Sequence, residues 1–447
     1  MKKSWLVLLS LGLIMAFSVS AFAVDVKVSG EYYAAGMYLN KTSLNDTINQ
    51  DDGYPGLSTA FYFQRLRVGT DFVVSPCLKL VTRFDALERI WGGARSSTDT
   101  TADIDSAGTR AENENIAADW AYINYVSAIG AFDVGYMNYG TTGTIFGNSS
   151  VPAARIKYYS NPIMNSIKVN ADFTKVGDKS YSAVNSSATW TDADKDAYAI
   201  EGVYSWKDGK AAVKIIYYRY ADTKPSTNYI KNYFLFTPYV IAKVGPVNIQ
   251  AELNYATGDD SNYDNIAAGD DVKLEQISGW VDATANFGMF NAGGTVAYVS
   301  GDDPNTTDKK EGGTLTGGVD WNPCLILFNN DINYWVGRLS GYDGSVASGK
   351  MTNAWFFQGR VGVKPTPQLS AMLSVAHAMA DKKLASYANG TYGTEIDLAG
   401  TYKITDNLSY MLGIGYLFTG DYFKGSDNPS YELVDDYILV NKLTLTF

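Results

Sequence analysis

Basic side chains lie at alternate positions on two neighbouring segments near the N-terminal end of the chain. One segment runs over 59–72 and the other over 78–90, and Ser75-Pro76-Cys77 between them is typical of a tight turn. Because side chains two positions apart in a strand point to the same face, the charged residues share one face of a hairpin. That face holds Arg65, Arg67, Asp71, Lys79, Arg83, Asp85 and Arg89. Arg and Lys bind carboxylate and phosphate groups, so the pattern predicts a basic stripe that attracts anions.

The sequence leaves two explanations of this stripe open. In one, the basic residues form a ladder along a pore, and Arg155, Lys157, Arg360 and Lys364 add to it from other strands. In the other, Arg and Asp on adjacent strands only neutralise each other. The loop over 91–115 is acidic and, if folded inward, would face the ladder across a constriction. Its acidic residues are Asp99, Asp103, Asp105, Glu112 and Glu114.

The elements that position these residues are predicted to be β-strands. Apolar and polar residues alternate with a period of two over 395–403, 408–418 and 437–447. Alternation alone is also found in a soluble sandwich, which exposes one face to water. The connections decide between the two, because short turns alternate along the chain with long polar loops, as in barrels of the bacterial outer membrane. Aromatic residues near strand ends suit a membrane–water interface.

We therefore expect an all-β chain that forms a single transmembrane antiparallel up-and-down β-barrel. It should have about 18 strands, with about 16–20 possible, short periplasmic turns and long extracellular loops. The weakest strand candidates lie around 153–159 and 313–321. Asn322-Pro323-Cys324 resembles the turn at Ser75-Pro76-Cys77, so a new strand is expected to begin at Leu325.

The first residues have the pattern of a secretory signal peptide. Lys2 and Lys3 form a positive start, an apolar run follows over 5–17, and Ala21-Phe22-Ala23 is a cleavage motif. We expect residues 1–23 to be removed and residues 24–447 to form the barrel.

The composition argues against several classes of protein. The chain has 447 residues, a formal net charge of −11, one histidine and two cysteines. The acidic balance argues against nucleic-acid binding. One histidine and no CxxC pair leave no haem or zinc motif, so neither a metal nor a cofactor is expected.

Three further features have plain structural explanations. Cys77 and Cys324 are expected to be free thiols on separate turns, too far apart for a disulfide. The acidic segments over 259–265 and 301–305 have oxygen ligands that could hold Ca²⁺ but lack the EF-hand pattern, so solvated loops are favoured. His377 is expected on the apolar face, which argues against an enzyme.

The last residues, Asn441-Lys442-Leu443-Thr444-Leu445-Thr446-Phe447, resemble the C-terminal signature of Gram-negative outer-membrane β-barrel proteins. In that family the segment, here Leu443, Leu445 and Phe447, is recognised by the barrel-assembly machinery. Within the family the chain is similar to large single-chain porins of the alginate-export and proteobacterial putative-porin type, through the segment over 78–92. The resemblance implies the outer membrane as location, with lipid and lipopolysaccharide around the barrel and a homotrimer as one possible assembly.

The expected function is that of a porin, a water-filled channel through which small hydrophilic solutes diffuse, with a mild anion preference from the basic stripe. The alternative is a barrel that acts as a sleeve for a partner such as a multihaem cytochrome conduit. An unobstructed lumen would favour the sleeve.

Overall fold

The computed structural model describes residues 24–45, 57–92, 116–179, 193–224, 228–265, 267 and 269–447. The predicted signal peptide lies outside the described residues, as does most of the acidic loop over 91–115. No described helix is long and apolar enough to cross a membrane.

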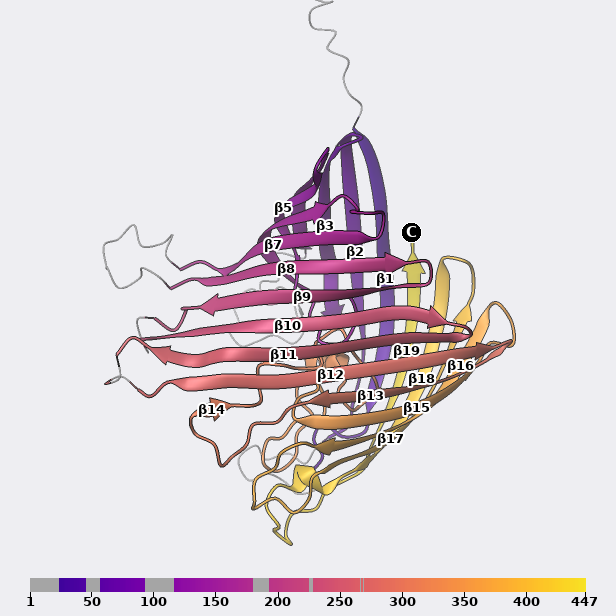
Figure 1. Ribbon diagram of the computed structural model, residues 1–447. Coiled ribbons are helices and arrows are strands. Elements are labelled where there is room, and N and C mark those ends of the chain that lie inside the picture. Colours follow the sequence, from indigo (N-terminus) through magenta and orange to yellow (C-terminus); the bar gives the residue numbers. More distant parts are fainter. Residues whose placement is uncertain are drawn as a thin grey trace, which may run out of the picture.

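The strands form a closed antiparallel up-and-down barrel of 18 strands, as predicted. Each strand pairs with its neighbours along the chain, and β1 pairs with both β2 and β19, which closes the barrel (Figure 1). The strands are β1 (Asp25–Leu39), β2 (Thr59–Ser75), β3 (Leu78–Ile90), β4 (Ile116–Ser127), β5 (Gly130–Tyr139), β6 (Val151–Ser160), β7 (Ile167–Gly177), β8 (Lys195–Trp206), β9 (Gly209–Tyr220), β10 (Tyr229–Val244), β11 (Val247–Tyr263), β12 (Val272–Phe287), β13 (Phe290–Val299), β15 (Ala354–Val363), β16 (Leu369–Ala380), β17 (Thr391–Lys403), β18 (Leu408–Thr419) and β19 (Asp436–Thr446).

Three short elements lie outside the up-and-down order. The two-residue strand β14 (Lys309–Lys310) pairs in parallel with β12. Helix α2 (Asn330–Trp335) begins after Asn329, whose side chain accepts hydrogen bonds from the backbone N–H groups of Asp331 and Ile332. The 3-10 helix η3 (Asp421–Lys424) follows β18.

The two faces of the wall differ as the alternation predicts. On β18, Leu412, Ile414 and Phe418 point outward and are exposed, while Leu417 points inward and is fully buried. On β17, Ile396 and Leu398 point outward. A barrel in lipid needs an apolar outer face, and the residues at the alternate positions of each strand then face the interior. Closure of the barrel also leaves no unpaired strand edge.

The stretch between β13 and β15 departs from the prediction. The segment around 153–159 is strand β6, but 313–321 is not a strand, and no strand begins at Leu325. Asn322-Pro323-Cys324 is not a turn at the rim. It lies within residues 321–351, which fold into the barrel and which we call the plug. Apolar plug residues, including Ile326, Phe328 and Ile332, pack against inward-facing wall residues in one buried cluster.

Candidate functional site

The predicted basic stripe lies on β2 and β3, where acidic residues accompany its cations. Arg67 forms a two-pronged ion pair with Asp85, at 2.7 and 2.6 Å. Lys79 Nζ lies 2.8 Å from Asp71 Oδ2, and Arg83 Nε lies 3.0 Å from Asp119 Oδ2 on β4. The cations of this wall therefore alternate with carboxylates, as in the second explanation of the stripe.

A β-bulge changes the register at the end of this stripe. Leu87 has a φ of 52°, and the pairing of β2 with β3 shifts between Gln64 and Leu66. As a result Glu88 turns to the interior, where its Oε1 lies 3.5 Å from Arg65 Nη1. Arg89 pairs with Gln64, on the face opposite to the inward-pointing residues. Simple alternation predicts that Arg89 lies on the inner face. This prediction is wrong, because a strict period of two takes no account of the extra residue in the bulge.

A second group of charged residues lies on the inner faces of β6, β7 and β9. Arg155 Nη2 lies 2.8 Å from Asp172 Oδ1, and Lys214 Nζ lies 3.9 Å from Asp172 Oδ2. Lys157 lies over the ring of Tyr159, at 4.6 Å from its centroid. We call Arg155, Lys157, Lys214 and Asp172 the β6–β9 cluster. Arg155 and Lys157 were predicted from the sequence. Lys214 was not, although Lys210, Ala212 and Lys214 share one face of their strand.

A polar cavity of about 400 Å³ lies inside the barrel beside this cluster. Tyr218 and Tyr233 stack on one side of it, with ring centroids 4.8 Å apart, and the hydroxyl groups of Tyr139 and Tyr220 lie 3.3 Å apart. Arg155 and Lys214 also line the cavity. The cavity therefore offers charges, hydroxyl groups and ring faces to a solute.

Two segments that fold into the barrel bound this cavity and are joined by hydrogen bonds. The first is the connection over 140–150 between β5 and β6, and the second runs over 313–321 into the plug. Gly147 N–H donates to Gly317 O at 3.2 Å, and Ser150 donates to Asp320 Oδ2 from its N–H at 3.0 Å and its hydroxyl at 2.7 Å.

Apolar and polar contacts fix the first segment further. Phe146 is fully buried between Trp280 and Trp321, and Thr144 donates a hydrogen bond to Glu252 on the β11 wall. Among the described residues, the segments over 140–150 and 313–351 therefore narrow the lumen. The acidic residues predicted to form a constriction, from Asp99 to Glu114, lie outside the described residues.

Wall residues of β15 and β17 attach the plug, and Gln358 Nε2 on β15 donates to Pro323 O at 2.7 Å. Glu395 on β17 accepts the N–H of Ile326 at 2.7 Å and the N–H of Leu327 at 2.6 Å. Glu395 is fully buried. The alternation of β17 predicts that Glu395 lies on the polar face. The neighbouring sequence does not indicate that its partner is the plug.

The remaining predicted residues occupy different places. Arg360 faces the interior from β15 and pairs with Asp282 at 2.7 Å. Lys364 follows β15 at the turn, where its N–H donates to Met289 O. At the closing seam, Leu443 and Leu445 point outward, and the backbone of Phe447 bonds to Gly30 at 2.8 and 3.0 Å.

Residues that suggested other chemistry have ordinary partners. His377 pairs with the outward-facing Phe357, and its Nδ1 lies 2.9 Å from Thr394 Oγ1. Among the acidic residues, Asp259 belongs to β11 and lies 2.7 Å from Lys273 Nζ, and Asp303 lies 3.2 Å from Lys382 Nζ. The N–H of Asn305 and the Lys382 ammonium lower the pKa of Asp303.

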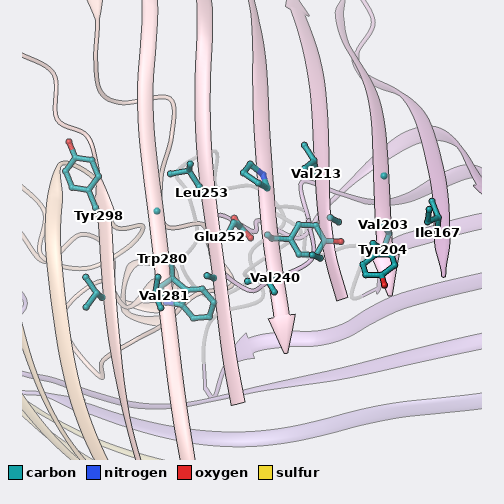
Figure 2. A pocket seen from close by; sticks show the side chains of 18 residues that line it. Ile167, Val203, Tyr204, Val213, Val240, Glu252, Leu253, Trp280, Val281 and Tyr298 are labelled. Atoms are coloured by element: carbon teal, nitrogen blue, oxygen red, sulfur yellow. The ribbon is translucent and has the colours of Figure 1, made fainter. Parts of the chain in front are cut away.

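A larger depression, of about 850 Å³, lies on the outer face of the wall from β8 to β13. Figure 2 shows Val213, Val240, Leu253 and Val281 along successive strands at this place. Glu252 appears behind them and turns to the interior, where it bonds to Thr144. The depression is apolar and faces lipid, so it is not part of the solute path.

The sequence matches no protein-family model and no curated protein. Solved structures match the fold. OpdQ, an outer-membrane porin of Pseudomonas aeruginosa, is 12% identical at a TM-score of 0.51, over 95% of this chain and 98% of that chain. OccAB3 of Acinetobacter baumannii is also 12% identical at a TM-score of 0.51, over 94% and 100%. At this identity the likeness concerns the fold alone. It confirms the predicted closed antiparallel up-and-down barrel.

The closed barrel and its apolar outer face place the chain in the outer membrane. In lipid, backbone polar groups must be satisfied within the protein, and a closed barrel does this without any free edge.

Proposed function

We propose that the barrel is a channel through which small hydrophilic solutes cross the outer membrane by diffusion. The observation that carries the proposal is the polar cavity inside the closed wall, bounded by the two interlocked segments. A lumen lined by charged and hydroxyl groups stays wet, as in known channel-forming barrels. Because the plug takes up part of the lumen, we expect only small solutes to pass.

A mild preference for anions is part of this proposal, and we assign it to the β6–β9 cluster instead of the β2–β3 stripe. In the cluster, Arg155 and Lys214 share the carboxylate of Asp172, and Lys157 adds a third cation. Glu201 on β8 and Asp133 on β5 are the cross-strand neighbours of Lys214 and Lys157. In the stripe, Arg67, Lys79 and Arg83 each have a carboxylate within ion-pair distance. Lys214 Nζ lies 3.9 Å from the Asp172 carboxylate, whereas the ion pairs of the stripe are 2.6, 2.8 and 3.0 Å long, and loosely paired basic side chains favour anions in a pore.

Single-channel recording tests the proposal. The refolded protein is inserted into a planar bilayer, and the reversal potential is measured in a salt gradient. We expect small steps of defined size and a weak anion preference. A folded barrel that gives no steps contradicts the channel, whereas steps with clear cation selectivity contradict only the anion preference.

The sleeve interpretation has no supporting observation. Residues 321–351 pack against the inner wall and fill space that a threaded partner needs. Recognition of Leu443, Leu445 and Phe447 by the assembly machinery, contact with lipopolysaccharide and a homotrimer stay predictions.

A further inference from the structure

Three ionisable groups meet where the plug contacts the β17 wall. Cys324 comes from the plug, and Glu395 and Asp397 come from β17. The Cys324 sulfur and one carboxylate oxygen of each acid all lie within 4.8 Å of one another. The exposed fractions of the three residues are 4%, 0% and 6%. A thiol and two carboxyl groups are thus enclosed together inside the barrel.

The two carboxylates have no cation beside them among the residues that the structure describes. Glu395 accepts two backbone N–H groups of the plug and shares a side-chain hydrogen bond with Asp397. Asp397 is otherwise poorly satisfied, because its Oδ2 lies 3.4 and 3.5 Å from Leu325 N and Ser374 Oγ. These distances are too long for good hydrogen bonds. Its Oδ1 is buried and has no hydrogen-bond partner.

Buried carboxylates that lack a partner are costly, and a bound cation removes the cost. We propose that Cys324, Glu395 and Asp397 form a binding site for one divalent transition-metal ion of the Zn²⁺ type. The donor set selects this class of ion, since a thiolate and two carboxylates suit Zn²⁺ or Co²⁺, whereas Mg²⁺ and Ca²⁺ prefer oxygen ligands alone.

The binding step balances in charge and protons. The metal displaces two protons to solvent, the Cys324 thiol proton and the proton shared by Glu395 and Asp397, and the Cys324 sulfur binds as thiolate. The buried group carries one net negative charge both before and after binding. Each carboxylate oxygen has two lone pairs, so Glu395 can bind the metal and still accept the N–H groups of Ile326 and Leu327.

Cobalt binding tests the site, and the test does not depend on channel activity. The full-length protein is refolded in detergent with reductant, with Co²⁺ present during refolding or added afterwards. Absorption from thiolate-to-cobalt charge transfer is then recorded. We expect the wild type and Cys77→Ser to saturate at one equivalent and Zn²⁺ to abolish the band. Cys324→Ser should lose the band, and Asp397→Asn should bind at least about tenfold more weakly.

The Cys77→Ser variant is the matched control, since it removes an exposed thiol at a turn. Folding of each variant is checked by the heat-dependent shift in electrophoretic mobility that barrels show. If Asp397→Asn does not fold, the comparison of wild type with Cys324→Ser decides alone. No band in the folded wild type, or an equal band in Cys324→Ser, overturns the proposal.

Discussion

The carboxylate of Glu395 on β17 accepts the backbone N–H of Leu327 at 2.6 Å, although 68 residues separate the two along the chain. The same carboxylate accepts the N–H of Ile326. One wall residue therefore fixes the middle of the plug. Both N–H groups are buried, so loss of the Glu395 carboxylate would leave two buried donors without a good acceptor, at a cost in stability.

Substitution Glu395→Gln should loosen the plug without opening the barrel. The amide leaves one of the two N–H groups facing a donor, which costs about 1–3 kcal/mol. We expect larger and noisier conductance steps in planar bilayers. Glu275→Gln is the matched control, because Glu275 is partly exposed and pairs with Lys309 at the loop end of β12. Unchanged steps in a folded Glu395→Gln barrel would show that the plug is held elsewhere.

Asp172 should govern ion preference through its two cations. Asp172→Asn leaves Arg155 and Lys214 without their shared carboxylate, so the reversal potential in a salt gradient should shift toward anion selectivity. Lys214→Met should shift it the other way. Lys364→Gln, at the turn after β15, serves as control and should change little. If both Asp172→Asn and Lys214→Met shift the potential in the same direction, the cluster does not set the preference.

The ion pairs of β2 and β3 should differ in their contribution to stability. Asp85 is 6% exposed and binds Arg67 with both oxygens, so Asp85→Asn should lower the free energy of unfolding by about 1–3 kcal/mol. Asp71 is about one-third exposed where it meets Lys79, and Asp71→Asn should cost less than about 1 kcal/mol. Urea unfolding in detergent measures both. Equal losses would contradict the difference in burial.

The two thiols should react at very different rates. Cys77 is exposed at the turn between β2 and β3, whereas Cys324 is buried in the plug. Burial raises the pKa of the Cys324 thiol and lowers its thiolate fraction. We expect a maleimide to label one thiol per folded chain quickly and the second only in denaturant. Rapid labelling of two thiols would place Cys324 in water, and Cys77→Ser identifies which thiol reacts first.

The wall of this barrel is predictable because one rule governs it. Strand residues alternate between lipid and interior, so Ile396, Leu398 and Glu395 could be assigned to their faces from sequence. The rule fails at Leu87, where one extra residue reverses the faces of Glu88 and Arg89. A bulge of this kind has no fixed sequence signature.

The plug could not be recognised because its apolar run, Leu325 to Phe328, resembles the start of a strand. Its burial depends on the facing wall, where small residues stand beside the buried Glu395 and Asp397. Ala376 and Ala378 on β16, with Gly413 and Gly415 on β18, make room for it. These small residues on inner faces are the signal in the sequence, and it becomes meaningful only once the strands are placed.

The contact of Ser150 with Asp320 sets an order of events during biogenesis. The first residue precedes β6 and the second follows β13. We expect the two to meet after the eight strands from β6 to β13 have paired and curved, since contacts between distant parts of a chain form late. The lumen is therefore expected to be wide during assembly and to become narrow in the last step. A barrel arrested before that step would let solutes through the membrane.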